Sequence, residues 1–421
     1  MEGRTYDTPG AYHTPGAYYT SGTYHTPGAY RTPRAYHAAG VRRTRIGAFL
    51  LAILLTAMLP MTVLASAEDP LQALAAYAGC DYVDILTSDM VVPGESVSDW
   101  IAIATGCSGN PVKRNAYLKG LEDYVTAEYE KNGCLHNIKS TEYHRISLAV
   151  LALGGDPTCF GKDSAGEPIN LIAEGTYGWE NSDSLGMQGL NGWIFALITL
   201  DAKYYDVPDD AVYTREDILA AILAAQTDEG GFGLSGGAPD VDITAMTLQA
   251  LAPYYHTGPE VQGSVDRALG WLSAQQNESG DFTSWGSGSA EGTAQTVIAL
   301  CSLGIDPRTD ARFVKNGNSA LDGLLQYRTE NGMFRHTLDG EADAMATEQA
   351  ALALIAVDRL DQNKGRIYDF TEIAVYEGND DSLKSEGKVE SNGWVLWVAG
   401  GILIAGGVTF VVIKRGKKKH V

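Results

Sequence analysis

Asp240 and Asp242 are the residues whose type and spacing are best suited to chemistry. They stand near the end of the segment GGFGLSGGAPDVDIT at 230–244, directly before an apolar helical pattern. Two carboxylates one residue apart at the start of a helix can act as a general acid and its electrostatic partner when burial raises the pKa of one of them. Asp at a helix start can also serve only as a cap for the first free amides. The sequence therefore leaves both roles open for this pair.

A repeat of about fifty residues must position this segment. The turn from Gln226 to Phe232 (QTDEGGF) recurs from Gln276 (QNESGDF) and less closely from Arg328 and Tyr129. Each turn lies between two helical patterns, of which the second is the more apolar and Ala-rich. Helix hairpins cannot bury their apolar faces alone, so they stack, and six of them can close into a ring. The predicted fold is all-α, an α/α toroid over 68–360, with an open solenoid as the alternative.

The second helix of each predicted pair is expected to line the inside of the ring, and the first pair should pack beside the last. The predicted pairs are 70–79 with 97–105, 113–130 with 141–153, 168–174 with 186–203, 214–226 with 241–254, 262–277 with 291–303, and 316–328 with 343–359.

The two ends of the chain predict a membrane-anchored protein. Residues 394–413, from Trp394 to Ile413, form an uncharged apolar run long enough to cross about 30 Å of hydrocarbon as a single transmembrane helix. The basic residues of 414–421 keep that end cytoplasmic. Residues 41–67 have the basic, apolar and small-residue order of a secretory signal peptide. We therefore expect a single-pass protein of the cell membrane with an extracellular ectodomain.

Two further segments have the composition of irregular chain. Residues 1–40 repeat TPGAYH-like units with a period of six, which predicts either a low-complexity extension or translated upstream DNA with Val41 as the true first residue. Residues 361–393 are polar and acidic without periodicity, as in a flexible stalk.

Charge and cysteine content exclude some functions. The net charge is −21, and because both ends are basic, the segment between them is more acidic still. Such a surface repels nucleic acid, so no nucleic-acid partner is expected. The five cysteines form no CxxC motif or Cys/His cluster, so no metal site is predicted. Disulfides between Cys80 and Cys107 and between Cys134 and Cys159 are possible, but spacing cannot fix the pairing.

The paired helices and QxxxGxF turns resemble the repeats of the prenyltransferase and squalene-cyclase superfamily, from Leu71 to Leu360. Within this region, residues 230–251 are similar to a segment of the class II terpene cyclases and of the cobalamin carriers such as intrinsic factor and transcobalamin. The resemblance implies a toroid. It leaves function open, because that fold serves cyclases, zinc-dependent transferases, complement-type domains and vitamin carriers.

Each branch of the superfamily implies a different role for these residues. Class II cyclases protonate an alkene or epoxide with the middle Asp of a DxDD motif, which Asp242 matches, but Ile243 replaces the last acid. Zinc-dependent transferases need an Asp, a Cys and a His at the metal, and Cys301 lies in an apolar helix without such neighbours. The segment from Asp242 to Met246 is similar to the Asp-Thr-Ala-Met of the cobalamin carriers with one residue inserted. Those carriers have a C-terminal β-rich domain where this chain has its stalk.

The repeat itself predicts a ligand site at one mouth of the ring. Aligning the second helices on their shared Ala-Leu places one residue of each helix at an equivalent position, namely His144, Asn191, Asp242, Glu291 and Met345. Polar side chains over an apolar barrel are typical of ligand sites. We expect other residues nearby to line the same mouth: Asp240, Thr244, Asp343, Tyr143, Trp179, Trp193 and Trp285. Helix capping and core packing are the alternative roles for each of them.

The sequence favours a binding or surface-interaction module for a hydrophobic or corrinoid-like, cobalamin-type ligand, and no cofactor is certain. No nucleophile constellation or phosphate loop favours an enzyme. The first alternative is a class II terpene cyclase with Asp242 and Asp240 as catalytic residues. The second is a toroid hydrolase of cell-wall glycans that uses Asp242 with Glu291 or Glu348. The expected partners are the plasma membrane, the small ligand, and membrane or cell-wall proteins.

Overall fold

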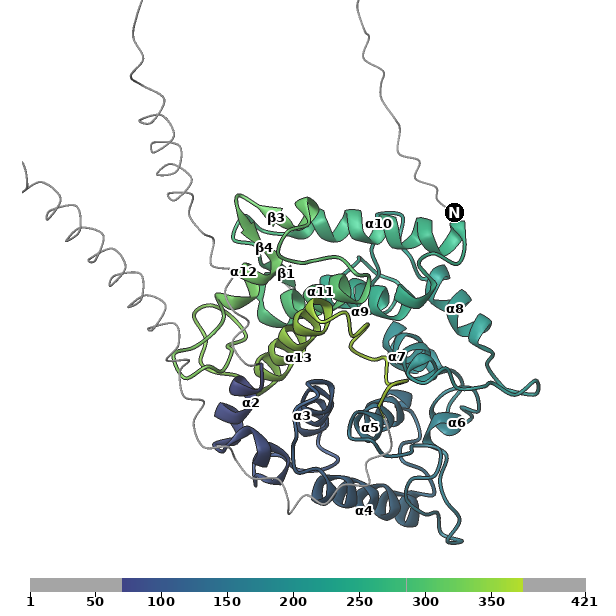
Figure 1. Cartoon of the computed structure of the whole chain (residues 1–421). Helices are drawn as coiled ribbons and strands as arrows, with labels where there is room; N and C mark the ends of the chain where they lie inside the picture. Colours follow the sequence, from purple (N-terminus) through teal and green to yellow (C-terminus); the bar gives the residue numbers. More distant parts are fainter. Residues whose placement is uncertain (1–69, 285, 374–421) are drawn as a thin grey trace, which may run out of the picture. The chain divides into compact units, whose positions relative to one another are not determined.

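The computed structural model describes residues 70–284 and 286–373, in which helices form a closed ring (Figure 1). Each inner helix contacts the next, and the last contacts the first. The inner helices are, in order, α3 (Ser96–Cys107), α5 (Ser140–Ala152), α7 (Leu190–Asp201), α9 (Val241–Leu251), α11 (Ala290–Ser302) and α13 (Ala344–Asp361). The closed toroid is thus observed, and the open solenoid is excluded for this part of the chain.

The first helix of each hairpin lies outside the ring, as predicted. These outer helices are α2 (Leu71–Ala78), α4 (Asn115–Asn132), α6 (Leu171–Gly175), α8 (Arg215–Ala224), α10 (Pro259–Gln275) and α12 (Ala320–Leu325). Helices α6, α8, α10 and α12 each pack on the inner helix of the preceding pair, and α2 packs on α13. The first pair therefore lies beside the last, which confirms the expected closure.

Short elements occupy the connections between these helices. Four 3₁₀ turns are η1 (Tyr82–Thr87), η2 (Leu185–Gln188), η3 (Ala252–Tyr254) and η4 (Ala311–Phe313). Strands β1 (Phe282–Ser284) and β2 (Ser287–Ser289) pair antiparallel with Phe282 opposite Ser289, and β3 (Val314–Lys315) pairs antiparallel with β4 (Asn318–Ser319). These strands were not predicted from the sequence, because two or three residues are too few to show a period of two.

The repeated turn is a compact unit that joins the outer to the inner helix in the last three hairpins. An isolated antiparallel β-bridge closes each of these turns. The bridges pair Gln226 with Phe232, Gln276 with Phe282, and Arg328 with Phe334. The glycine within each turn has a positive φ of 91–96°, a conformation that side chains disfavour. At Gly280 a Cβ atom would also lie 2.3 Å from the backbone oxygen of Ser319. The repeated Gly is therefore required both by its backbone conformation and by close packing.

A threonine near the start of α9, α11 and α13 holds this turn in place. The backbone amide of Phe232 donates to Thr244 Oγ1 at 2.8 Å, and the amides of Phe282 and Phe334 donate in the same way to Thr293 and Thr347. All three threonines and all three phenylalanines are fully buried. The recurrence of Thr in the repeat thus has a structural cause.

Replacing Thr244 by valine should lower the free energy of unfolding by about 1–3 kcal/mol, because the buried Phe232 amide loses its acceptor. Urea unfolding of the variant measures this change. Thr244→Ser keeps the hydroxyl and should lose clearly less. A valine variant as stable as the wild type would show that this hydrogen bond does not hold the turn.

The helical domain continues beyond the predicted boundary at residue 360. Helix α13 ends at Asp361, and the following segment runs from α13 across the ring to the end of α7 (Figure 1). Its Ile367, Tyr368 and Phe370 are buried, and the amide of Phe370 donates to the backbone oxygen of Ala202 at 2.8 Å. Residues 361–373 therefore belong to the packed domain and not to a stalk.

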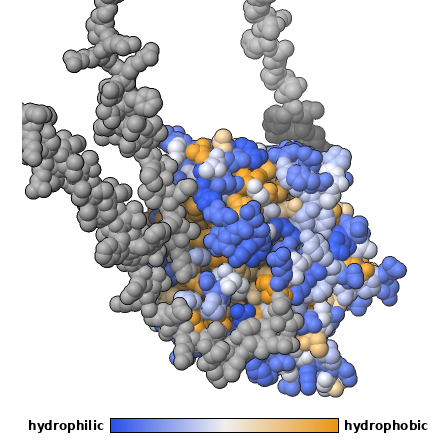
Figure 2. All heavy atoms as spheres, in the orientation of Figure 1, coloured by the Kyte–Doolittle hydropathy of each residue, from blue (hydrophilic) through white to orange (hydrophobic). Residues whose placement is uncertain are grey.

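Several predicted features lie outside the described residues. These are the repeats at 1–40, the signal peptide at 41–67, the segment 374–393, the span at 394–413 and the tail at 414–421. Within the described part, the helices all lack the combination of length and apolar character that a membrane span needs. The possible disulfides are not formed, since all five cysteines are free. The described surface in Figure 2 is mostly hydrophilic, with apolar patches between.

Candidate functional site

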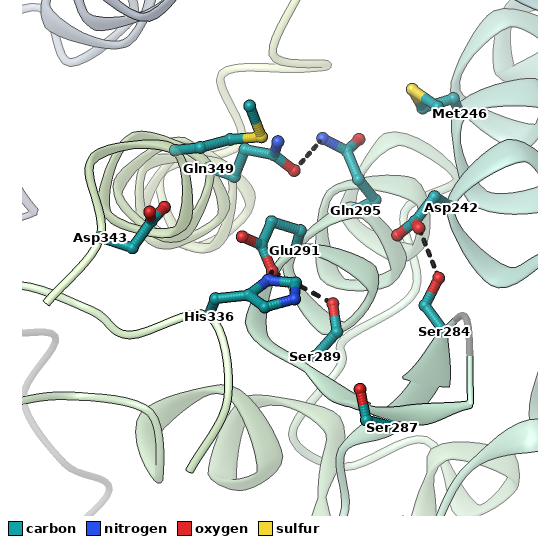
Figure 3. A pocket seen from close by; sticks show the side chains of 11 residues that line it. Asp242, Met246, Ser284, Ser287, Ser289, Glu291, Gln295, His336, Asp343 and Gln349 are labelled. Carbon is teal, nitrogen blue, oxygen red and sulfur yellow. Dashed lines mark hydrogen bonds and ion pairs between the residues drawn. The ribbon is translucent and has the colours of Figure 1, made fainter. Parts of the chain in front are cut away.

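A cavity of about 610 Å³ opens where α9, α11 and α13 begin (Figure 3). The β1–β2 hairpin and the loop before α13 complete its wall. Its lining residues are Asp242, Met246, Ser284, Ser287, Ser289, Glu291, Gln295, His336, Asp343, Met345 and Gln349.

Helical periodicity explains why these side chains meet. Asp242, Glu291 and Met345 are each the second residue of an inner helix, and Met246, Gln295 and Gln349 each follow one turn later. Residues four apart lie on one face of a helix. Three neighbouring inner helices therefore present two rows of side chains to the cavity.

Asp240, and not Asp242, is the cap of α9. Its Oδ1 accepts hydrogen bonds from the backbone amides of Asp242 (3.0 Å) and Ile243 (3.2 Å). Ser284 Oγ donates to Asp242 Oδ2 at 2.6 Å and lies 3.2 Å from Asp240 Oδ2. Asp242 Oδ1 is buried and has no hydrogen-bond partner. The capping role that the sequence left open thus falls on Asp240, and Asp242 is a lining residue of the cavity.

The environment of Asp242 favours its protonated form. Burial raises its pKa to about 6, and the negative charges of Asp240 and Glu291 act in the same direction. The hydrogen bond from Ser284 and the charge of His336 oppose this rise. A carboxylic acid whose pKa is raised toward neutral pH can serve as a proton donor.

The raised pKa predicts a pH-dependent effect of Asp242→Asn on stability. Between the unfolded pKa of 3.8 and about 6, the folded state retains a proton that the unfolded state has lost, so wild-type stability falls as pH rises. Asn carries no charge and avoids this loss. At pH 7–8 the variant should be more stable than the wild type by on the order of 2 kcal/mol, and the gain should disappear near pH 4. Thermal unfolding across this range measures the difference, and a constant difference would contradict the raised pKa.

Glu291 and His336 are hydrogen-bonded to each other at the cavity (Figure 3). His336 Nδ1 lies 2.7 Å from Glu291 Oε2, which also accepts from Ser289 Oγ at 3.1 Å. The backbone amide of Ala290 donates to the backbone oxygen of His336 at 3.1 Å and so ties the loop before α13 to the start of α11. The pair therefore has a fixed position at the cavity.

Glu348 is a further acid close to this site. It is buried, its Oε2 has no hydrogen-bond partner, and burial raises its pKa well above the usual range. The charges of Glu291 and Asp343 add to that rise. Glu348 does not line the cavity. Of the two carboxylate pairs considered for a glycan hydrolase, only Asp242 with Glu291 shares it.

The structure separates the other predicted residues from this cavity. Asn191 lines a different, smaller cavity of about 190 Å³ with Trp100, Thr141, Arg145 and others on α3, α5 and α7. Thr244 is fully buried in its hairpin, so the prediction that it lines the mouth is wrong. Trp285 lies outside the described residues.

The expected position of His144 at the mouth is wrong. His144 is buried, its Nε2 lies 2.6 Å from the backbone oxygen of Gly175, and burial lowers its pKa to about 4. Helix α5 begins twelve residues before the Ala of its Ala-Leu, whereas α9 and α11 begin nine residues before theirs. An alignment based on the shared Ala-Leu therefore places a residue of α5 at the mouth that lies about one helical turn too far along the helix. Thr141 is the second residue of α5 and lines the smaller cavity with Arg145.

The predicted aromatic residues fill the interior instead of the mouth. Tyr143 and Trp179 are buried and stack edge to face with ring centroids 5.7 Å apart. Trp193 packs in the same way against Tyr213 at 5.3 Å. Their alternative role in core packing is the one that the structure supports.

Several residues of the cavity escaped the sequence analysis. Extending the repeat alignment by one helical turn would have found Met246, Gln295 and Gln349. The hairpin serines have no counterpart in the other repeats, and His336 lies in a loop without periodicity. No signal in a single sequence points to these loop residues.

The chain is similar in sequence to two bacterial enzymes. It is 27% identical over 265 residues to drimenyl diphosphate synthase of Streptantibioticus cattleyicolor, a match that covers 58% of this chain and 48% of that enzyme. It is 24% identical over 208 residues to copalyl diphosphate synthase of Streptomyces cyslabdanicus, covering 48% and 36%. The chain thus spans about half or less of the length of these relatives. No family model matches it.

Solved structures superpose on the chain at lower sequence identity. Protein geranylgeranyltransferase-I of Candida albicans superposes with a TM-score of 0.47 at 12% identity, covering 73% of this chain and 94% of that one. A type II terpene cyclase from Scytonema gives 0.39 at 14%, covering 63% and 88%. The proteins that the chain matches in sequence are consistent with the resemblance to the prenyltransferase and squalene-cyclase superfamily that the repeats indicate.

Proposed function

We propose that this protein is a terpene-cyclase-like enzyme in which Asp242 donates a proton to an alkene of a small apolar substrate. One observation carries the proposal: Asp242 is a buried acid with a pKa of about 6 and an unpartnered oxygen, and it lines a cavity of about 610 Å³. That volume lies within the range of about 300–1,000 Å³ typical of ligand pockets. The sequence relatives support the same reaction class.

The proposed reaction leaves the composition of the substrate unchanged. The proton of Asp242 adds to one alkene carbon, a second alkene attacks the resulting cation, and the ring closes. The cyclised cation then loses a proton to water to form a new alkene, and solvent returns a proton to Asp242. Ser284 stabilises the carboxylate between these steps because it donates to Asp242 Oδ2. The Ser284 hydroxyl also hydrogen-bonds to Asp240 and so links Asp242 to a second carboxylate. In this proposal, Asp240 takes over the role of the last acid of the DxDD motif, which is Ile243 in this chain.

Product analysis tests this proposal. The full-length protein is incubated with polyprenols and polyprenyl diphosphates of increasing chain length, and the extracts are examined by gas chromatography with mass spectrometry after removal of any phosphate. We expect a product with the mass of its substrate and fewer double bonds. Recovery of every substrate unchanged would reject the proposal.

A binding module for a hydrophobic or corrinoid-like ligand is the second candidate. The hydrogen-bonding side chains of Gln295, Gln349 and the hairpin serines favour it, since they can hold a ligand without reacting. Such a module would bind a probe saturably and release it unchanged. It would also tolerate Asp242→Asn better than an enzyme would.

We also propose that the domain lies outside the cell and is anchored by residues 394–413. The signal-peptide pattern at 41–67 and the basic residues after 413 support this topology. Protease added to intact cells should release the domain and leave the C-terminal tail protected. Recovery of uncleaved protein from the cytosol alone would reject it.

A further inference from the structure

The charged side chains of the cavity are mainly acidic. Asp242, Glu291 and Asp343 line it, and His336 is the one basic residue in that lining, which holds no Lys or Arg among the described residues. His336 is paired with Glu291 at 2.7 Å. An anionic group that entered the cavity would therefore meet the carboxylates of Glu291 and Asp343 and no Lys or Arg side chain of the described lining.

The helix N-termini around the cavity offer little compensation. Free backbone amides at a helix start can bind anions, but here side chains already accept from them. Asp240 accepts from Asp242 and Ile243 in α9. Ser289 accepts from Gly292 in α11, and Asp343 accepts from Ala346 in α13. The caps thus occupy amides that a phosphate would need, and two of the three caps are themselves carboxylates.

The neutral polar groups of the cavity form a chain of amides across the three helices. Gln249 Nε2 donates to Gln295 Oε1 at 2.8 Å, and Gln295 Nε2 donates to Gln349 Oε1 at 3.0 Å (Figure 3 shows the second of these). Gln295 and Gln349 line the cavity. Amide edges and serine hydroxyls can donate to and accept from an uncharged hydroxyl group, and such a group meets no charge repulsion.

We propose that the substrate is an apolar molecule whose polar end is an uncharged hydroxyl group, an isoprenoid alcohol and not a diphosphate. This inference rests on the proposed function, whose site it uses. The amide chain and the serines bind the hydroxyl, Asp242 faces the alkene, and the surrounding carboxylates select against an anionic head group.

Matched probes test this selectivity. Geraniol and geranyl diphosphate share one hydrocarbon chain, and their binding to the full-length protein in lipid nanodiscs is measured by titration calorimetry, with empty nanodiscs subtracted. We expect geraniol to bind at least about tenfold more tightly than geranyl diphosphate. The same preference should hold in buffer with EDTA and in buffer with Mg²⁺. Tighter binding of the diphosphate under either condition, or no binding of geraniol, would overturn the proposal.

A charge-neutral variant supplies the matched control. In Glu291→Gln combined with Asp343→Asn, the Asn still caps α13, and two negative charges are lost. Affinity for geranyl diphosphate should rise by about tenfold while affinity for geraniol changes by less than about threefold. An unchanged diphosphate affinity would show that the carboxylates do not set selectivity. Conversion that survives Asp242→Asn would reject the proposed function and leave this preference for the alcohol standing.

Discussion

Replacing Asp242 by asparagine should lower substrate turnover by about 100- to 10,000-fold, the range that general acid catalysis supplies. Asn has nearly the same shape and no transferable proton, so the cavity should keep its form and lose its chemistry. Ser284 can still donate to the amide oxygen of the new side chain. Rates measured under single-turnover conditions, with thermal unfolding as a check of the fold, decide the outcome.

Asp240→Asn is the matched control for this experiment. Asp240 caps α9 through Oδ1, and Asn caps a helix about equally well. The variant should therefore keep its stability and lose much less activity than Asp242→Asn. Equal losses in the two variants would show that the pair acts through the helix start and that Asp242 is not the proton donor.

Replacing Asp99 by alanine should cost about 3–5 kcal/mol of stability, since it leaves a buried guanidinium without its main partner. Asp99 is fully buried, and its Oδ2 accepts from Arg145 Nε at 2.9 Å. Its Oδ1 accepts from the Tyr117 hydroxyl at 2.7 Å and the Gly94 amide at 3.1 Å. The Arg145 side chain is only 8% exposed. Urea unfolding of the variant measures the loss.

The pair of Lys113 and Asp84 provides the comparison, because both side chains are about one-third exposed. Asp84→Ala should change stability by less than about 1 kcal/mol, as is usual for pairs that water screens. Similar losses for the buried and the surface substitution would contradict the account of Asp99. Substitution of Asp99 and Arg145 together by leucine should cost less than Asp99→Ala alone, since no charge is then left buried.

The architecture was predictable because its cause is repeated along the chain. The last three hairpins have the same Gly with positive φ, the same buried Phe and the same threonine, so one of these turns predicts the position of the next. Closure followed from the number of hairpins and from the apolar second helices. The end of the domain was not predictable, since Ile367, Tyr368 and Phe370 are buried in a segment with no helical or strand period.

The candidate site was predictable only where it follows the repeat. Asp242 and Glu291 share one position of their helices, and the structure brings both to one cavity. The predicted position of His144 at the mouth is wrong because α5 starts three residues earlier than α9, relative to the shared Ala-Leu. His336 and Ser284 come from connections whose course depends on tertiary contacts that a single sequence does not reveal.

The most direct test of the account is a reaction in deuterium oxide. If Asp242 delivers a solvent-exchangeable proton to an alkene carbon, each molecule of cyclised product made by the wild-type protein should carry one carbon-bound deuterium, and mass spectrometry of the product will show it. The Asp242→Asn variant should form this product about 100- to 10,000-fold more slowly. A cyclised product free of deuterium, or a deuterated product made equally well by the variant, would contradict the role of Asp242 as the proton donor.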